Sequence, residues 1–148
     1  MHLTLHADYS LRVLLYLATH PGRPASTQEM ADAYGISKHH LVRVVQTLAV
    51  QGFVDARAGR SGGVTLGREP KDIKVGQVLR AAEPDFHLVE CFDKARNTCP
   101  ITPACALKGV LAEAREAFLS TLDRYTLVDL VGRSRPDLAD FFLPAHEG

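Results

Sequence analysis

The chain has 148 residues, of which 46% are hydrophobic and 23% charged, with 17 basic and 17 acidic side chains. This length fits one domain, or a small domain with an appendage, and the hydrophobic fraction is high enough for a buried core, which argues against a disordered chain. No apolar run is long enough to cross a membrane, and the N-terminus lacks the pattern of a signal peptide. Three cysteines without a secretory signal favour a reducing compartment, so we expect a cytoplasmic protein with no membrane partner.

The charges are unevenly divided along the chain. Residues 1–82 carry 10 Lys and Arg against 6 Asp and Glu, whereas residues 83–148 carry 7 against 11. A basic first part followed by an acidic second part indicates that only the first part meets a polyanion such as nucleic acid.

The first predicted helix begins at Asp8 and stops at Pro21-Gly22. Its apolar residues recur at helical spacing, and Asp8 is expected to be its N-cap, accepting backbone N–H bonds from the first turn. Arg12 follows four residues later, so the two side chains are expected to pair across one turn.

A helix-turn-helix is predicted at about residues 28–51. Ser26 and Glu29 have the spacing of a capping box, which opens a short helix that Gly35 ends. Ser37 then caps a second helix, which stops at Gly52. The apolar positions of this second helix are Leu41, Val44, Val45 and Leu48. Its outer face is polar and basic, with Lys38, His39, His40, Arg43 and Gln46.

Two short strands are predicted next, one beginning at Phe53 and one at residues 64–66, joined by the basic, glycine-rich tip AGRSGG at residues 58–63. Strands in this position form a wing, here at about residues 53–68. An amphipathic helix with a basic face is often only a solvated surface, but the order of capping box, turn, helix and basic wing favours DNA binding. We therefore predict a mostly α fold with a small β-wing, in which residues 1–82 form a winged helix-turn-helix domain. The predicted DNA-contacting residues are Thr27, Gln28, Ser37, Lys38, His39, His40, Arg43, Arg57, Arg60, Ser61, Gly62 and Gly63.

Beyond the wing, residues 75–82 are predicted to form a short helix and residues 83–106 a cysteine-rich loop. Helices predicted over residues 103–132 carry an apolar stripe at Leu107, Leu111, Ala114, Phe118, Leu122 and Tyr125. Because so little of the chain is left to cover this stripe, we expect it to pack along its twin in a homodimer, with packing on its own winged domain as the alternative. Residues 133–148 form a tail, in which the apolar residues 141–143 have no legible role.

The three cysteines, Cys91, Cys99 and Cys105, have the spacing C-x7-C-x5-C in a polar segment that contains prolines. An odd number of thiols is not a disulfide framework, and polar surroundings argue against buried core thiols. Three soft sulfur ligands suit an iron–sulfur cluster or zinc, and either one needs a fourth ligand. There is no C-x2-C pair of the kind typical of structural zinc sites, but zinc completed by a histidine or water is an open alternative.

A winged helix that opens with LTLHADYSLRVLLYLA, has SGG in its wing and precedes three cysteines and a long helix resembles the IscR/NsrR family of bacterial iron–sulfur regulators. The resemblance extends over about residues 1–132. IscR-type members complete their cluster with a histidine three residues after the last cysteine, where this chain has Lys108, which cannot be a ligand. NsrR-type members use three cysteines and an aspartate of the partner subunit, which implies Cys91, Cys99, Cys105 and Asp8 as the ligands here.

The resemblance implies a homodimer with one iron–sulfur cluster per subunit, a four-iron four-sulfur cluster being favoured over a two-iron two-sulfur one. It also implies a nitric-oxide-sensing transcriptional repressor, which binds palindromic double-stranded operator DNA until nitric oxide attacks the cluster. A redox or iron–sulfur-homeostasis regulator on the same scaffold is the first alternative. An iron–sulfur electron carrier and a zinc-stabilised DNA-binding module are two more. An enzyme is not expected, because no Ser/His/Asp or paired-carboxylate constellation is evident.

Overall fold

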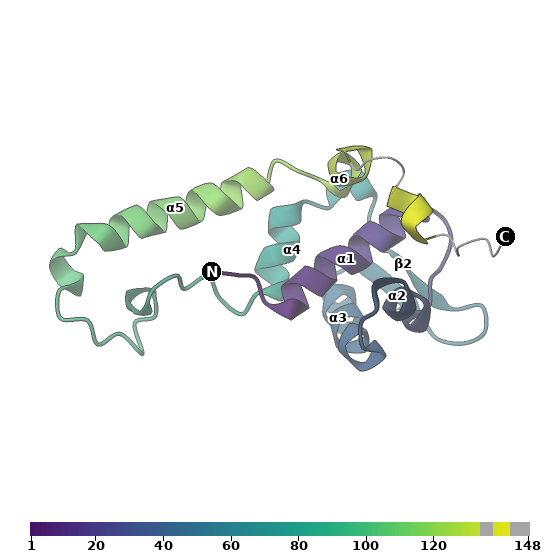
Figure 1. Ribbon diagram of the computed structural model, residues 1–148, viewed down its shortest axis with the longest axis horizontal. Coiled ribbons are helices and arrows are strands. Elements are labelled where there is room, and N and C mark those ends of the chain that lie inside the picture. The colour runs from purple at the N-terminus through teal and green to yellow at the C-terminus, as the bar shows by residue number, and fades with distance from the viewer. Residues whose placement is uncertain (134–137, 143–148) are drawn as a thin grey trace.

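The computed structural model describes residues 1–133 and 138–142. It is elongated, with a compact body at one end and an arm that projects from it (Figure 1). We use "body" for residues 1–82 together with α6 and η4, and "arm" for residues 83–122. The α-helices are α1 (Leu5–Thr19), α2 (Thr27–Tyr34), α3 (Lys38–Val50), α4 (Val75–Ala82), α5 (Ala106–Leu122) and α6 (Leu127–Arg133). The strands are β1 (Val54–Arg57) and β2 (Gly63–Leu66), and the 3-10 helices are η1 (Pro70–Asp72), η2 (Glu90–Phe92), η3 (Thr102–Ala104) and η4 (Leu138–Phe142). The predicted mostly α fold with a small sheet is confirmed.

Helix α1 begins at Leu5, three residues before Asp8, so the prediction that Asp8 is its N-cap is wrong. Thr4 is the N-cap, and its hydroxyl oxygen accepts the N–H of Ala7 at 3.1 Å. The backbone N–H and the hydroxyl of Thr4 both donate to Glu83, at 2.7 and 3.0 Å, which fixes the cap from outside the helix. Asp8 instead lies in the first turn, where its negative charge interacts favourably with the positive end of the helix dipole. Its predicted pairing with Arg12 is confirmed, at 2.7 Å.

The helix-turn-helix consists of α2 and α3, as predicted. Ser26 is the N-cap of α2 and accepts the N–H of Glu29 at 3.0 Å. In a full capping box the Glu29 side chain would also accept the backbone N–H of Ser26. Here the Glu29 carboxylate instead accepts the hydroxyl of Tyr16 at 2.6 Å and pairs with Arg23. Ser37 occupies the N-cap position of α3 without a side-chain capping bond. The four predicted apolar positions of α3 are all buried.

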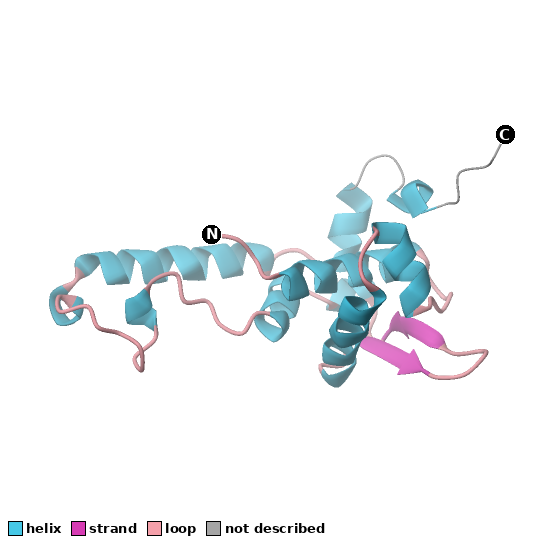
Figure 2. Cartoon of the chain, turned by 60° about the horizontal axis from the view of Figure 1, so that its bottom comes forward, coloured by secondary structure: helices cyan, strands magenta, loops and turns pink. Residues whose placement is uncertain are grey.

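The wing is an antiparallel pair in which Val54 lies opposite Leu66 and Arg57 opposite Gly63 (Figure 2). An isolated bridge from Ala25 to Val64 attaches the wing to the start of the helix-turn-helix. Gly62 is required at the tip, because a Cβ atom there would lie 2.2 Å from the carbonyl oxygen of Arg57. The tight turn therefore holds the two strands in register while its basic side chains project outward.

The core of the body lies between α1, α3, the sheet and α4. Its largest fully buried side chains include Leu14, Met30, Leu41, Leu48, Ile73 and Leu79. Helix α6 closes this core from the other side, because Leu127 is fully buried and its N–H donates to the carbonyl of Ile73 at 3.1 Å. Burial of this much aliphatic surface makes the body the stable part of the chain.

Helix α5 leaves the body and carries most of its apolar side chains into solvent (Figure 1). Within Ala106–Leu122, all of which the structure describes, Leu119 alone is buried. Leu107, Val110 and Phe118 are 61%, 60% and 41% exposed. Of the predicted stripe, Leu107 and Phe118 are exposed, Leu122 packs against the body, and Tyr125 lies beyond the end of α5. The alternative, packing on its own winged domain, describes only the C-terminal end of the helix.

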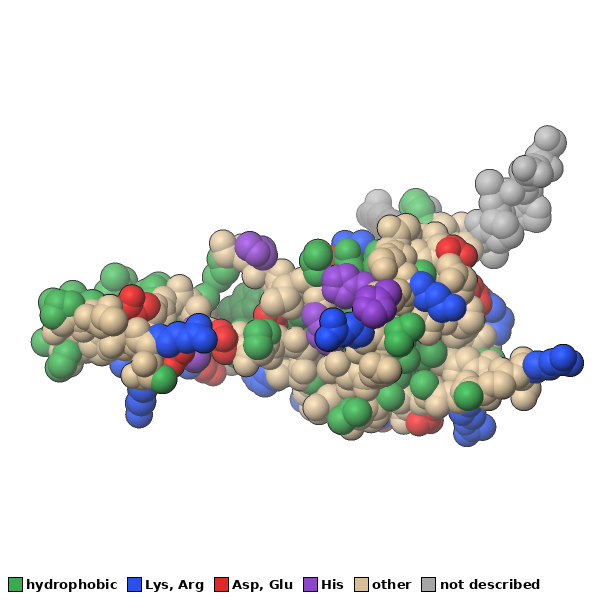
Figure 3. All heavy atoms as spheres, turned by 90° about the horizontal axis from the view of Figure 1, so that it is seen from below, with side chains coloured by type: hydrophobic (Ala, Val, Ile, Leu, Met, Phe, Trp, Pro, Cys, Tyr) green, Lys and Arg blue, Asp and Glu red, His purple; other side chains and the backbone are tan. Residues whose placement is uncertain are grey.

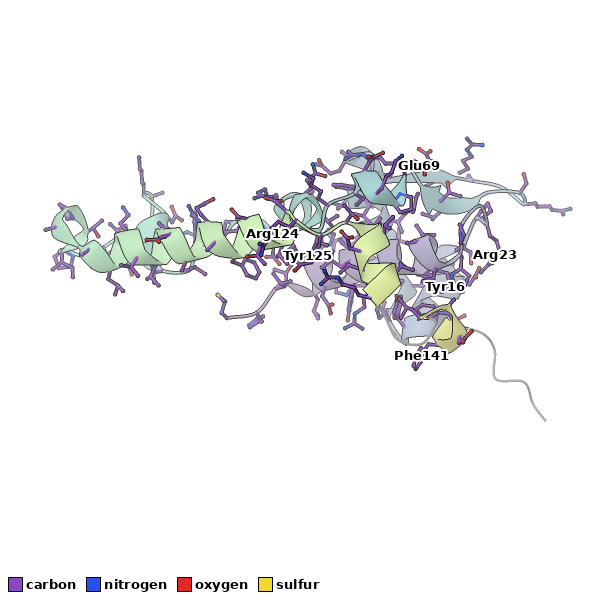
Figure 4. All side chains as sticks on the ribbon, turned by 90° about the horizontal axis from the view of Figure 1, so that it is seen from above. Tyr16, Arg23, Glu69, Arg124, Tyr125 and Phe141 are labelled. Atoms are coloured by element: carbon purple, nitrogen blue, oxygen red, sulfur yellow. The ribbon has the colours of Figure 1, made fainter. Side chains whose placement is uncertain are left out.

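A polar joint connects α5 to α4. The Arg80 guanidinium donates two hydrogen bonds to the Asp123 carboxylate, at 2.7 and 2.8 Å. Gly76 makes this close approach possible, because a Cβ atom there would lie 2.1 Å from Oδ1 of Asp123. The neighbouring Arg124 and Tyr125 mark the connection to α6 in Figure 4. Apolar contacts accompany this ion pair, because Phe86 and Leu122 of the arm pack against Ala7, Leu79 and Ala82 of the body.

The C-terminal helix η4 returns to the body, on the side that carries Tyr16 and Arg23 (Figure 4). The ring of Phe142 lies 4.8 Å from that of Tyr16 in α1 and 5.2 Å from that of Tyr34 in α2. Phe141 is 74% exposed. Of the predicted apolar triplet, one residue thus packs on the body, one faces solvent, and residue 143 lies outside the described residues.

Candidate nucleic-acid interface and candidate metal centre

The outer face of α3 exposes Ser37, Lys38, His39, Arg43 and Gln46. In the described part of the chain, none of these five side chains makes a hydrogen bond or ion pair with the protein. In Figure 3, histidine and basic side chains gather on this face of the body. Uncommitted donors on an exposed helix of a helix-turn-helix have the arrangement that contacts DNA.

His40 is placed differently from its neighbours. Its ring stands edge-on to Tyr9 of α1, with the centroids 5.1 Å apart, and it is only half-exposed. His40 therefore lines the boundary between α1 and α3 instead of standing at the centre of the outer face.

The wing presents Arg57, Arg60 and Ser61 to solvent, whereas Gly62 and Gly63 are half-buried and serve the turn. A basic side chain at the far end of the wing is the outermost feature of the body in Figure 3. On α2, Thr27 is half-buried and the side-chain amide of Gln28 donates to Asp32 at 2.8 Å. Gln28 is thus partly engaged within its own helix, whereas the predicted DNA-contacting side chains that are exposed on α3 and the wing are free of such contacts in the described residues.

The three cysteines lie on the arm, all as free and half-exposed thiols. Cys91 is the middle residue of η2, and Cys99 precedes η3. Cys105 is the N-cap of α5, so the helix predicted to begin at residue 103 begins at Ala106 instead. The reason is that Thr102 and Pro103 start a separate 3-10 turn, and α5 begins only after it.

Side-chain hydrogen bonds shape the loop around the cysteines. The Glu90 carboxylate accepts the N–H and the hydroxyl of Thr98, at 2.7 and 2.8 Å, and these bonds lower the pKa of Glu90. The side chain of Asn97 accepts the N–H of Cys99 at 3.1 Å and donates to Thr102 at 3.0 Å. Sequence reasoning did not find Glu90 and Asn97, because their bonds depend on how the loop folds back on itself.

No group of three or more Cys, His, Asp or Glu side chains converges as a metal site within residues 1–133 and 138–142 of this single chain. Asp8 is on the body, in its ion pair with Arg12, with 38% of its side chain exposed. The donor set nevertheless suits a soft metal centre, because the three thiols are free and accessible and lie on a polar loop. The predicted ligand set therefore remains a prediction, and one chain alone does not assemble it.

Residues 3–133 match the model of the Rrf2 family, described as "Iron-dependent Transcriptional regulator". The chain belongs to the Rrf2 family. Two similar relatives are both named "HTH-type transcriptional regulator NsrR". The one from Bacillus subtilis is 50% identical over 132 residues, which cover 88% of this chain and 90% of the relative. The one from Shouchella clausii is 47% identical over 132 residues, covering 88% and 89%.

Solved structures of Rrf2 regulators have the same fold. CymR (YrzC), the global cysteine regulator of Bacillus subtilis, superposes with a TM-score of 0.73 at 27% identity and covers 90% of this chain and 98% of its own. IscR from T. potens superposes with a TM-score of 0.72 at 26% identity, covering 89% and 87%. These findings confirm the predicted family. This Rrf2 member is a DNA-binding transcriptional regulator of the NsrR type and not an enzyme. No helix in its described ranges has both the length and the apolar character needed to span a bilayer.

Proposed function

We propose that this Rrf2 regulator is a cytoplasmic, nitric-oxide-sensing repressor. It binds palindromic operator DNA as a homodimer while its iron–sulfur cluster is intact, and it releases the DNA when nitric oxide attacks the cluster. The observation that carries the proposal is the set of three free thiols on an arm that also exposes an apolar helix face. The names of the NsrR relatives, at 50% and 47% identity, support the choice of regulator type.

The exposed face of α5 supports the homodimer. Leu107, Val110 and Phe118 lie on a helix that leaves the body, and exposed large apolar side chains in a row are unfavourable in water. A second copy of α5 would bury this apolar face without any other partner, because it presents the same apolar residues. Residues 103–132, proposed as the dimerisation helices, contain all of α5 and all of α6 except its last residue, Arg133.

Cys91, Cys99 and Cys105 would hold the cluster together with Asp8 of the partner subunit, with one cluster per subunit and four irons favoured over two. When bound, the cluster supplies iron that reacts with nitric oxide. The Asp8 side chain is accessible at the surface, which leaves it within reach of another chain. Lys108 is a cation and does not compete as a ligand.

DNA recognition is assigned to α3 and the wing. Lys38, His39 and Arg43 are exposed on α3 and face the major groove, while Arg57 and Arg60 on the wing contact the minor groove or phosphates. The absence of intramolecular partners for these side chains in the described residues supports this role, because no protein contact has to be broken when DNA binds.

Glu83 offers a physical route between the cluster loop and the DNA-binding domain. It is the first residue of the arm, and its carboxylate holds the N-cap residue of α1, Thr4. A loop that changes position when the cluster is lost therefore acts on the start of α1, which packs against α3. Couplings between two sites are usually about 1–3 kcal/mol, so apoprotein is expected to bind its operator roughly 5–150-fold more weakly.

The first test is anaerobic purification followed by absorbance, iron and sulfide analysis. Operator affinity at fixed salt, together with dimer content, is then measured for cluster-loaded, apo and nitric-oxide-treated protein. We expect Cys→Ala changes at positions 91, 99 and 105 to abolish cluster binding and Asp8→Ala to weaken it. Lys94→Ala, in the same loop, is the control that leaves the cluster intact. A colourless zinc protein, or equal affinity in all three states, would contradict the proposal, and a response to oxidants but not to nitric oxide would favour a redox regulator.

A further inference from the structure

An open hollow of about 470 Å³ lies between α1 and α3, lined by polar side chains together with the exposed Val50. His6 from α1 forms one wall, and His40, Arg43, Gln46 and Thr47 from α3 form the other. Among the described residues that line it there is no Asp or Glu, so its electrostatic character is neutral to positive. The sequence analysis assigned no role to His6, because it lies outside the helix-turn-helix.

The hollow is built from donors that have no partner. The side chains of His6, Arg43 and Gln46 make no hydrogen bond or ion pair within the residues that the structure describes. Arg12, Arg23 and Arg80, by contrast, are each paired with a carboxylate. A hollow that gathers free donors and excludes acidic side chains is complementary to an oxygen anion.

The backbone of both walls is held by hydrogen bonds. The ring of His40 rests on Tyr9, and the hydroxyl of Ser10 donates to the backbone carbonyl oxygen of His6 at 2.7 Å. The Thr47 hydroxyl donates to the backbone carbonyl oxygen of Arg43 at 3.2 Å. These bonds position the main chain of the donors, and the side chains of His6 and Arg43 can turn toward an anion.

We propose that this hollow binds a backbone phosphate of the operator, with His6 and Arg43 as its donors. The inference rests on the proposed DNA binding by α3. When the outer face of α3 enters a major groove, a sugar–phosphate strand runs along the side of the helix, where α1 stands. Contacts to phosphate set the register of a protein on DNA without reading its sequence. Of the three α3 side chains that face the major groove, Arg43 thereby contacts the backbone at the edge of the groove, and Lys38 and His39 remain for the base edges.

The test measures fluorescence anisotropy of operator and random DNA over a range of salt concentrations. His6→Ala is expected to lower the affinity for operator and for random DNA by the same factor. His6→Gln, which keeps a donor, is expected to restore part of the affinity. Arg43→Ala is expected to weaken both DNAs alike and to reduce the salt slope by about one. His2→Ala, a histidine outside the hollow, is the matched control and is expected to bind as the wild type does.

Distinct outcomes separate this inference from the proposed interface. Unchanged binding of His6→Ala, or relaxed base specificity in Arg43→Ala, would overturn the phosphate site while leaving DNA reading by α3 in place. Lys38→Ala and Arg60→Ala without any loss of affinity would instead overturn the proposed interface itself. Inorganic phosphate at matched ionic strength distinguishes the source of the anion. If it displaces operator from wild type and His6→Ala alike, the hollow is not where phosphate acts.

Discussion

The body and the arm are stabilised in different ways. In the body, Leu14, Leu41 and Leu48 are at most 1% exposed, and the helices and the wing enclose a continuous core. In the arm, Leu107 and Val110 are about 60% exposed, and the cysteine loop is shaped by polar side chains such as Glu90 and Asn97. Apolar burial is the main stabilising force in folding, so we expect the body to contribute most of the folding free energy, whereas the solvent-exposed face of the arm contributes little within a single chain.

The sharpest test of this contrast is a charge on the exposed face of α5. Phe118→Asp places a carboxylate in the proposed dimer interface, and an uncompensated buried charge costs about 3–5 kcal/mol. The dimer dissociation constant should then rise by roughly two to four powers of ten, measured by sedimentation velocity. Ser120→Asp, which puts the same charge on the opposite side of α5, is the control. A Phe118→Asp protein that remains dimeric would show that α5 is not the interface.

Truncation of one leucine in each region tests the difference in folding energy. On the monomeric Phe118→Asp background, Leu41→Ala in the core should lower the free energy of unfolding by about 2–5 kcal/mol. Leu107→Ala in the arm should change it by less than about 0.5 kcal/mol, because its side chain is already in water. Urea titration followed by circular dichroism measures both. Equal losses would mean that the arm shares the core of the body.

Two adjacent phenylalanines in η4, Phe141 and Phe142, provide a test with a smaller expected effect on the free energy of unfolding. Phe142→Ala removes a half-buried ring that packs on Tyr16 and Tyr34, and we expect a loss of about 1–2 kcal/mol in the free energy of unfolding. Phe141→Ala is the control, because that side chain is 74% exposed and its removal should be nearly neutral. Thermal unfolding of the two variants side by side would reveal whether the tail belongs to the body. If both changes are neutral, it does not.

The joint between the two regions predicts a weak pH dependence. The hydrogen bonds from Arg80 lower the pKa of Asp123 below its ordinary value of 3.8, so the folded carboxyl stays charged where the unfolded one is protonated. The pair therefore stabilises the folded state above about pH 4, and this contribution is lost as the pH falls through the lowered pKa. Because the pair is partly exposed, Arg80→Ala should cost only about 0.2–1 kcal/mol at pH 7.

Urea titrations of Arg80→Ala and wild type between pH 7 and pH 3 measure that contribution directly. The difference between the two proteins should shrink toward the acid end of this range. Arg124→Ala, an adjacent exposed arginine, is the control and should behave as the wild type does. A difference that persists unchanged at pH 3 would show that Arg80 acts through packing and not through the charge of Asp123.

Local signals predicted most of the body. The spacing of Leu41, Val44, Val45 and Leu48, the glycine at position 35 and the turn at residues 58–63 each act over a few residues, and these elements formed where they were expected. The start of α1 was wrong because Thr4 is selected by Glu83, 79 residues away in the sequence. The predicted helix start at residue 103 was wrong because a 3-10 turn precedes α5, and periodicity does not distinguish the two kinds of helix.

The candidate sites were predictable by residue type but not by arrangement. The spacing of the cysteines indicates soft ligands, yet the shape of their loop depends on hydrogen bonds from Glu90 and Asn97 that the spacing does not reveal. The hollow beside α3 joins His6 to residues more than thirty positions later, and the contact of Phe142 with Tyr16 spans most of the chain. Such contacts follow from tertiary packing, which no local pattern encodes.

The joint at Asp123 makes α5 a lever. With 17 residues, the helix is about 25 Å long, so each degree of rotation at the joint displaces its far end by about 0.4 Å. The cysteine loop meets α5 at that far end, whereas the body is attached at the near end. If two such levers lie along each other, an angular change of a few degrees is amplified into a translation of each body. Consequently, in the proposed dimer the displacement that a given rotation produces is proportional to the length of α5. Shortening the helix by whole turns would reduce that displacement in proportion.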